Sequence, residues 1–130
     1  MEAALIARLL ASADVTARVG QRVTWGRRAQ GGALPAIVLH LVDAPRDYHL
    51  KGPSGLIAAR VQVDCWGDSF ASAKHAARAV EAELSGERWT TNPVRIDAVL
   101  IADERDDTFD EGGDALYRTS LDLMVHHAIA

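Results

Sequence analysis

Apolar and polar residues alternate with a period of two in long segments of this chain, and this pattern limits its fold more than any other feature. The odd positions from Ala59 to Cys65 are apolar, whereas Arg60, Gln62 and Asp64 between them are polar. Such alternation is typical of β-strands that bury one face. The segments 35–48, 56–66, 94–102 and 116–127 are therefore predicted to be strands.

Two segments have helical spacing instead. Leu5 and Leu9 belong to one apolar stripe near the N-terminus, and a short turn follows before Gly20. A second helix is predicted after Asp68 or Ser69, where apolar residues recur at helical spacing as far as position 84. The predicted order is α-β-β-α-β-β, an α+β fold with a four-stranded antiparallel sheet and both helices on one face. Residues 20–34 are expected to form a loop, with a possible short strand at Val23.

The first predicted hairpin is longer than the helix that would cover it. Its arms of about a dozen residues span roughly 40 Å at ~3.3 Å per residue. A helix of about 17 residues spans only about 25 Å. We therefore expect this β-hairpin to overhang the helical layer, and such overhangs are natural docking places for another subunit.

Composition is consistent with one domain over residues 1–130. The chain is 48% hydrophobic and 25% charged, with a net charge of −4. This charge argues against a dedicated nucleic-acid binder. Neither a long apolar run nor a basic N-terminal region occurs, so no membrane span and no secretory signal are expected. The single cysteine, Cys65, excludes an internal disulfide and fits a reducing compartment.

The charge is divided unevenly along the chain. Residues 1–60 carry a net charge of +4 and residues 61–130 a net charge of −8. Seven of the twelve residues at 103–114 are acidic, and this stretch is expected to be a loop between two strands. A calcium loop is a poor match there, because the glycine comes one place late and no helix pair flanks it. A solvated loop and a docking surface for a basic partner both remain open interpretations.

No catalytic, cofactor or metal motif is present in the sequence. His126 and His127 are adjacent on a predicted strand and would point to opposite faces, and the other histidines lack chelating spacing. Cys65 shares a face with Val61 and Val63, so we expect a buried structural thiol. No nucleophile and base stand out as a set. We therefore predict that the chain is not an enzyme and holds no cofactor or metal.

Several segments together resemble the small tail-completion, or tail-terminator, proteins of long-tailed phages and gene transfer agents. The resemblance covers nearly the whole chain and includes the alanine-rich helix after the second strand. It rests on the opening helix with Val19-Gly20, Leu34-Pro35-Ala36-Ile37-Val38, Arg60-Val61-Gln62-Val63-Asp64-Cys65-Trp66, Asp103-Glu104-Arg105-Asp106, and Leu116-Tyr117-Arg118 leading into Ser120-Leu121-Asp122.

The resemblance implies a structural protein of the head–tail junction that is assembled in a bacterial cytoplasm. Proteins of this family form a ring, usually a hexamer, at the head-proximal end of the tail tube. The ring ends tube polymerisation and presents a surface to a head-side connector, and DNA only passes through its bore. The implied partners are copies of the chain itself, the major tail tube protein and the connector or stopper, with no membrane.

A ring needs two different patches on each subunit, and the uneven charge suggests which residues form them. Arg22, Arg27 or Arg28 of one subunit is expected to meet Asp106, Asp107 or Glu111 of the next. We also expect an acidic or neutral bore, so that DNA slides. The candidate interface residues for subunits or partners are Arg22, Trp25, Arg27, Arg28, Arg46, Lys51, Asp103, Glu104, Asp106, Asp107, Asp110 and Glu111.

Two other interpretations stay open at this point. One is another head–tail connector, such as a stopper. The other is a small ligand- or RNA-binding module, which would need exposed aromatic residues beside basic ones on an open sheet face. Trp66 fits that requirement, whereas Asp64 and Asp122 on the same predicted face do not.

Overall fold

Most of the chain is in β-strands in the computed structural model, which describes residues 1–28 and 32–129. The described elements are, in order, α1 (Glu2–Ala11), α2 (Ala13–Val19), β1 (Val23–Trp25), β2 (Ala36–Asp43), β3 (Arg46–His49), β4 (Gly52–Gly67), α3 (Phe70–Leu84), β5 (Trp89–Thr91), β6 (Val94–Glu111) and β7 (Asp114–Ile129).

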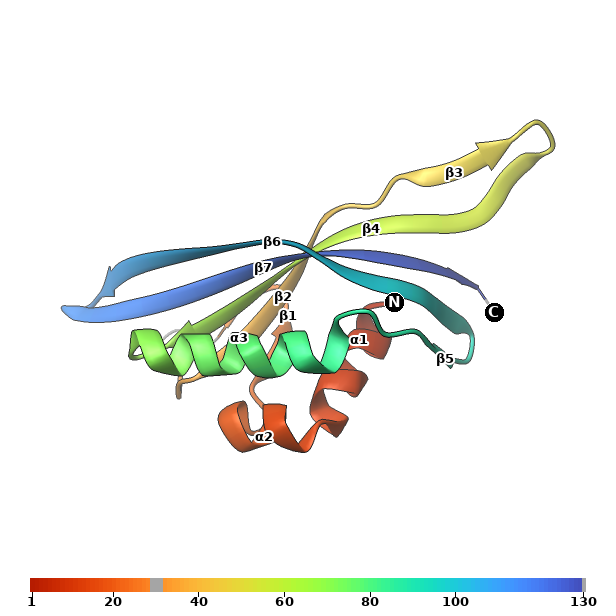
Figure 1. The fold of residues 1–130 in the computed structure, drawn as a ribbon. Helices are drawn as coiled ribbons and strands as arrows, with labels where there is room; N and C mark the ends of the chain where they lie inside the picture. The colour runs from red at the N-terminus through yellow and green to blue at the C-terminus, as the bar shows by residue number, and fades with distance from the viewer. Residues whose placement is uncertain (29–31, 130) are drawn as a thin grey trace.

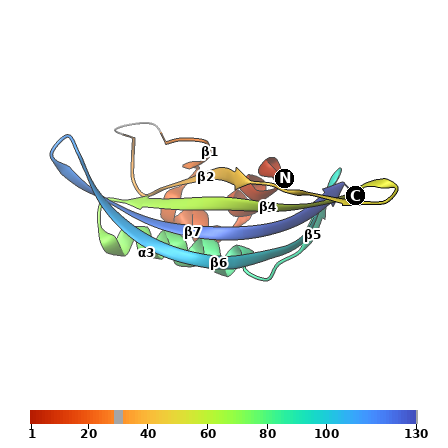
Figure 2. The same cartoon turned by 90° about the horizontal axis from the view of Figure 1, so that it is seen from above.

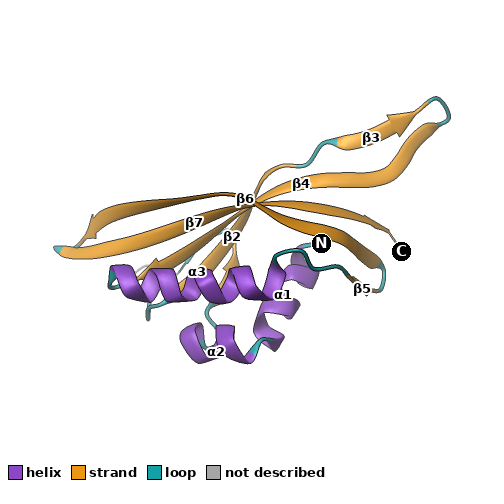
Figure 3. Cartoon of the chain, in the orientation of Figure 1, coloured by secondary structure: helices purple, strands orange, loops and turns teal. Residues whose placement is uncertain are grey.

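All the described strands belong to one curled sheet, with the helices gathered on one side of it (Figures 1 and 3). The order across the sheet is β1-β2-β4-β7-β6-β5, and β3 pairs with the first part of β4. β1 and β2 are parallel, whereas every other pair is antiparallel. Seen from above, the long strands curve together across the helices (Figure 2).

The predicted fold, an α+β domain with a four-stranded antiparallel sheet and two helices, is wrong. The described part of the chain has a seven-stranded mixed sheet and three helices. β5, which was missed, and β1, which was expected only as a possible short strand at Val23, have three residues each, too few for a period-two pattern to be visible. The predicted strand over 35–48 is also divided, because β2 ends at Asp43 and β3 begins at Arg46 beyond Pro45.

The acidic stretch is not the loop that we predicted. β6 continues through it to Glu111, β7 begins at Asp114, and only Gly112 and Gly113 form the turn. Both glycines have positive φ, at 60° and 92°, as two-residue hairpin turns of this kind require. The strand lacks alternation because charged side chains occupy both of its faces. The period-two signal therefore disappears where the strand itself continues.

The hydrophobic core lies between the sheet and the helices. The core side of the sheet presents fully buried residues such as Val61, Val63 and Leu123, and α3 packs its alanine face against them. Cys65 is buried in this core, which confirms its predicted structural place, and burial raises the pKa of its thiol. Alanine side chains let the α3 backbone lie close to the strands.

Serine side chains set the start of two helices. The Ser12 hydroxyl accepts a hydrogen bond from the Val15 amide and begins α2, and the Ser69 hydroxyl accepts one from the Ser72 amide and begins α3. Arg8 of α1 forms an ion pair with Glu83 of α3 at 2.8 Å, which joins the two helices. None of the helices in the described residues is long and apolar enough to span a membrane.

Two long hairpins extend from opposite ends of the sheet (Figure 1). The β6–β7 hairpin turns at Gly112 and Gly113, whereas the β3–β4 hairpin turns at Leu50 and Lys51. β4 pairs with β7 only as far as Ile57, so the rest of the β3–β4 hairpin leaves the body of the sheet. Figure 1 shows it rising away from the helices.

Candidate interaction surfaces

The sheet face opposite the helices, called the open face here, is organised around a buried carboxylate. Asp64 of β4 is 4% exposed and accepts hydrogen bonds from Gln62 Nε2 at 2.8 Å and from Ser120 Oγ at 2.7 Å. His40 Nδ1 and Arg118 Nη1 lie 3.8 and 3.9 Å from its other oxygen. The carboxylate of Asp64 therefore has hydrogen-bond donors and cationic or polar groups on both of its oxygens.

An aromatic and cationic cluster lies beside Asp64, toward the β6–β7 turn. The Trp66 and Phe109 rings are 5.6 Å apart, and the Arg118 guanidinium lies over both rings, 5.4 and 4.9 Å from their centroids. Arg118 also donates to Asp107 at 2.7 Å. Arg28 lies over the Trp66 ring and donates to Glu111 at 3.0 Å. These contacts fix the base of the β6–β7 hairpin to the open face.

On the helix side, α3 neutralises the acidic part of β6. Glu104 accepts hydrogen bonds from Arg78 and from Lys74, both at 2.5 Å, and these two cations hold the pKa of Glu104 down to about 2. Asp106 is paired with Lys74 at 2.8 Å and accepts from Thr119 at 2.9 Å. The hydrogen bond from Lys74 likewise lowers the pKa of Asp106.

The predicted acidic interface residues therefore differ in their availability. Glu104, Asp106, Asp107 and Glu111 are each paired with a cation of their own chain. Asp103 and Asp110 are exposed on β6, and neither has an ion pair among the described residues. Arg28 and Glu111 were among the alternatives for a contact between subunits, and in the structure they form an ion pair within one chain.

The predicted basic residues lie in two separate places. Arg22, Trp25, Arg27 and Arg28 surround β1, while Arg46 and Lys51 lie on the β3–β4 hairpin at the other end of the sheet. Arg22 donates through Nε to the Pro35 carbonyl at 2.9 Å, and Trp25 packs against the core. Arg27 is exposed. The expected loop around β1 includes residues 29–31, which lie outside the described residues.

A set of exposed apolar side chains on the β3–β4 hairpin was missed by sequence reasoning. Leu50 is fully exposed at the tip, Tyr48 is 68% exposed, and Leu56 is 47% exposed. The Lys51-Gly52-Pro53-Ser54-Gly55 segment was interpreted as a turn, and the apolar residues on either side of it were given no role. The sequence signal that could have indicated these exposed residues is Leu50 next to Lys51 at the end of a strand.

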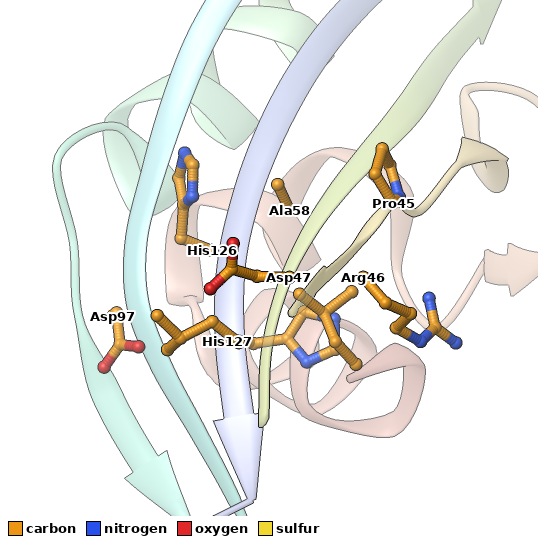
Figure 4. Close-up of a pocket in the computed structure, with 9 residues that line it drawn as sticks. Pro45, Arg46, Asp47, Ala58, Asp97, His126 and His127 are labelled. Atoms are coloured by element: carbon orange, nitrogen blue, oxygen red, sulfur yellow. The ribbon is translucent and has the colours of Figure 1, made fainter. Parts of the chain in front are cut away.

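A pocket of about 480 Å³ lies where this hairpin leaves the sheet (Figure 4). Its lining includes Pro45, Asp47 and Ile57, together with Asp97 and the two histidines of β7. Burial lowers the pKa of His127, so this imidazole favours its neutral form. The lining offers no nucleophile paired with a base. Within the described residues, no three His, Cys, Asp or Glu side chains gather as a metal site.

Comparison with known proteins identifies a family and a similar solved structure. The family model described as tail completion protein gp17 matches residues 3–128. A chain of a solved structure titled "Virion of native gene transfer agent (GTA) particle" is similar with a TM-score of 0.76 and 23% sequence identity. That match covers 98% of this chain and 94% of the other, and at this identity it establishes the fold alone. No curated protein matches the sequence.

Proposed function

Because the chain belongs to the family of tail completion protein gp17, a family of structural proteins of the virion tail, we propose that it forms a ring at the head-proximal end of a tail tube. The family match over residues 3–128 is the observation that carries this proposal. It also confirms the resemblance found in the sequence, and with it a location in the virion tail. The proposed ring is a hexamer that ends tube polymerisation and joins the tube to a head-side connector.

The two flanks of the sheet supply the different patches that a head-to-tail ring requires. The flank with β1 carries Arg22 and Arg27, and the flank with β6 carries Asp103 and Asp110. Asp103, Asp110 and Arg27 are exposed members of the predicted interface set on these flanks, and none of the three has an ion pair among the described residues. They therefore replace Asp106 and Asp107 as the charges that we propose to act between subunits, because those two carboxylates already have partners in their own chain.

The open face has the character that we propose for the bore. Arg60 of β4 is exposed there without an ion pair among the described residues, whereas Arg105 is paired with Asp122 at 2.7 Å and Arg118 with Asp107. A surface with such compensated charge does not hold the DNA phosphates strongly. DNA would pass along it without binding, in agreement with a role in transit only.

The β3–β4 hairpin is the surface that we propose for contact with the tail tube protein. It projects beyond the helices and exposes Tyr48, Leu50 and Leu56, with Arg46 and Lys51 beside them. Apolar side chains exposed on a projecting hairpin gain stability when a partner buries them, at roughly 25 cal/mol per Å². In this proposal the charged flanks make the contacts between subunits of the ring, and the β3–β4 hairpin makes the contact with the tube.

The ring is tested by light scattering on the purified chain over a range of concentration and salt. We expect assembly to a ring for the wild type and a shift toward monomer for Asp103→Lys, with wild-type assembly weakening as salt rises. The matched control is Asp14→Lys, which makes the same charge change on α2, away from both flanks. Unchanged assembly of Asp103→Lys would contradict the proposed subunit contact.

A further inference from the structure

The outer edge of β6 is unusually long and open. β5 pairs only with Val94–Ile96, and the Gly86 amide donates to the Val99 carbonyl. From residue 100 to residue 111, no strand of the described chain pairs with this edge. Open edges are normally short or covered, because their free N–H and C=O groups pair with other chains. An open edge of this length therefore indicates a partner strand.

The opposite edge of the sheet is β1, and it is also open on its outer side. The Ile37 amide donates to the Arg22 carbonyl at 2.9 Å, and the Gly26 amide donates to the Leu39 carbonyl at 2.8 Å. Since backbone groups alternate along a strand, the Trp25 N–H and C=O point away from β2. The sheet therefore ends in two open edges, one on each flank.

The direction and position of these two edges match. β1 and β6 run in opposite directions within the sheet, so β1 of a neighbouring copy in the same orientation would be antiparallel to β6. The residue pairs across the sheet run from Thr24 through Val38, Asp64 and Ser120 to Arg105. The β1 edge therefore lies level with the middle of the open β6 edge.

We propose that β1 of one copy pairs with the outer edge of β6 of the next copy, so that one antiparallel sheet continues across each subunit boundary. This inference rests on the proposed ring and specifies its contact. The exposed charges that have no ion pair within the described chain favour this pairing, because Arg27 follows β1 whereas Asp103 and Asp110 lie on β6. Two β1 edges or two β6 edges would bring like charges together, which is unfavourable. The contact is therefore head-to-tail.

Hydrogen exchange followed by mass spectrometry tests the pairing on the intact chain, compared between dilute monomer and assembled ring. We expect exchange to slow at least tenfold on assembly at the amides around Arg105, in the middle of 100–111, and at Trp25, while the β3–β4 tip does not change. Rings in which 100–111 exchange as fast as in the monomer would overturn the edge pairing and leave the ring standing. Absence of any ring would overturn both. If the exchange slows only after tail tubes are added, the edge pairing between copies is overturned, and a strand of the tube protein covers this edge instead.

A charge exchange gives a second, independent test of the same contact. Arg27→Glu and Asp103→Arg should each shift the ring toward monomer, and the combined variant should restore assembly. Both side chains are exposed, so neither change should disturb folding, and circular dichroism of each variant checks this. Failure of the combined variant to recover assembly, with all variants folded, would contradict the pairing of these flanks.

Discussion

The two long hairpins of this protein are built in opposite ways. The β6–β7 hairpin is charged, and its side chains are bound to its own chain through Arg118, Arg28 and Lys74. The β3–β4 hairpin is apolar at its tip, and Tyr48 and Leu50 lie exposed. One hairpin thus pairs most of its charges within the monomer and leaves its outer backbone edge, with Asp103 and Asp110, for a neighbouring copy, whereas the other leaves apolar surface for a partner. Charged residues along a strand can therefore stabilise the fold of a single chain, whereas apolar side chains exposed on a projecting hairpin indicate contact with a partner.

The largest expected effect is the loss in the free energy of unfolding when an arginine is removed from each hairpin. Arg118→Ala removes the cation between Trp66 and Phe109 and leaves Asp107 unpaired, so we expect a loss of about 2 kcal/mol in the free energy of unfolding. Arg46→Ala on the other hairpin is the matched control and should change it by less than about 0.5 kcal/mol. Urea unfolding measures both variants. Equal losses would show that the two hairpins are not anchored differently.

A second prediction concerns pH. Lys74 and Arg78 hold the folded pKa of Glu104 near 2, below its ordinary value of 4.5, so this carboxylate stabilises the fold above pH 4.5 and the gain disappears as pH falls toward 2. Glu104→Gln should therefore cost about 1–2 kcal/mol at pH 7, after allowance for solvent screening. The difference from wild type should vanish near pH 2.

Exposed Asp103 on the same strand provides the control for Glu104. Asp103→Asn should change the free energy of unfolding by less than about 0.5 kcal/mol. Urea unfolding of the three proteins between pH 2 and pH 7 makes the comparison. A Glu104→Gln difference that stays constant across this range would exclude the ion pairs with α3 as its cause.

The smallest expected effect on stability is at the free hairpin. Leu50 is fully exposed, so Tyr48→Ser combined with Leu50→Ser should change the free energy of unfolding by less than about 0.5 kcal/mol. The same variant should lose binding to purified tail tubes, measured by co-sedimentation. Phe70→Ser on α3 removes another exposed apolar side chain and should keep binding. Equal loss of binding in both variants would contradict a specific role for the hairpin.

The sequence predicted those strands that have one apolar face. β4 and β7 alternate because the helices cover one side of them, and this is visible at Val61, Val63 and Leu123. The second half of β6 was not predictable in this way, because Glu104 faces α3 while Arg105 and Asp107 lie on the open face. The period-two pattern arises because one face of a strand is buried. A strand with charged residues on both faces therefore shows no such pattern.

The candidate interface residues stay a prediction as contacts between subunits. The division between a basic first half and an acidic second half is real, yet part of it serves pairing within one chain, as in Arg28 with Glu111. No local pattern distinguishes a pair within a chain from one between chains. The apolar tip of the β3–β4 hairpin was hidden because Pro53 and Gly55 suggested a turn, whereas both residues lie within β4.

The central claim is that the chain closes the head-proximal end of a tail tube as a ring. Negative-stain images of purified tubes mixed with the chain test it most directly. We predict a ring of density at one end of each tube and none along its length, with tubes that no longer elongate. Density along the sides, or tubes that keep elongating after the chain is added, would contradict the account.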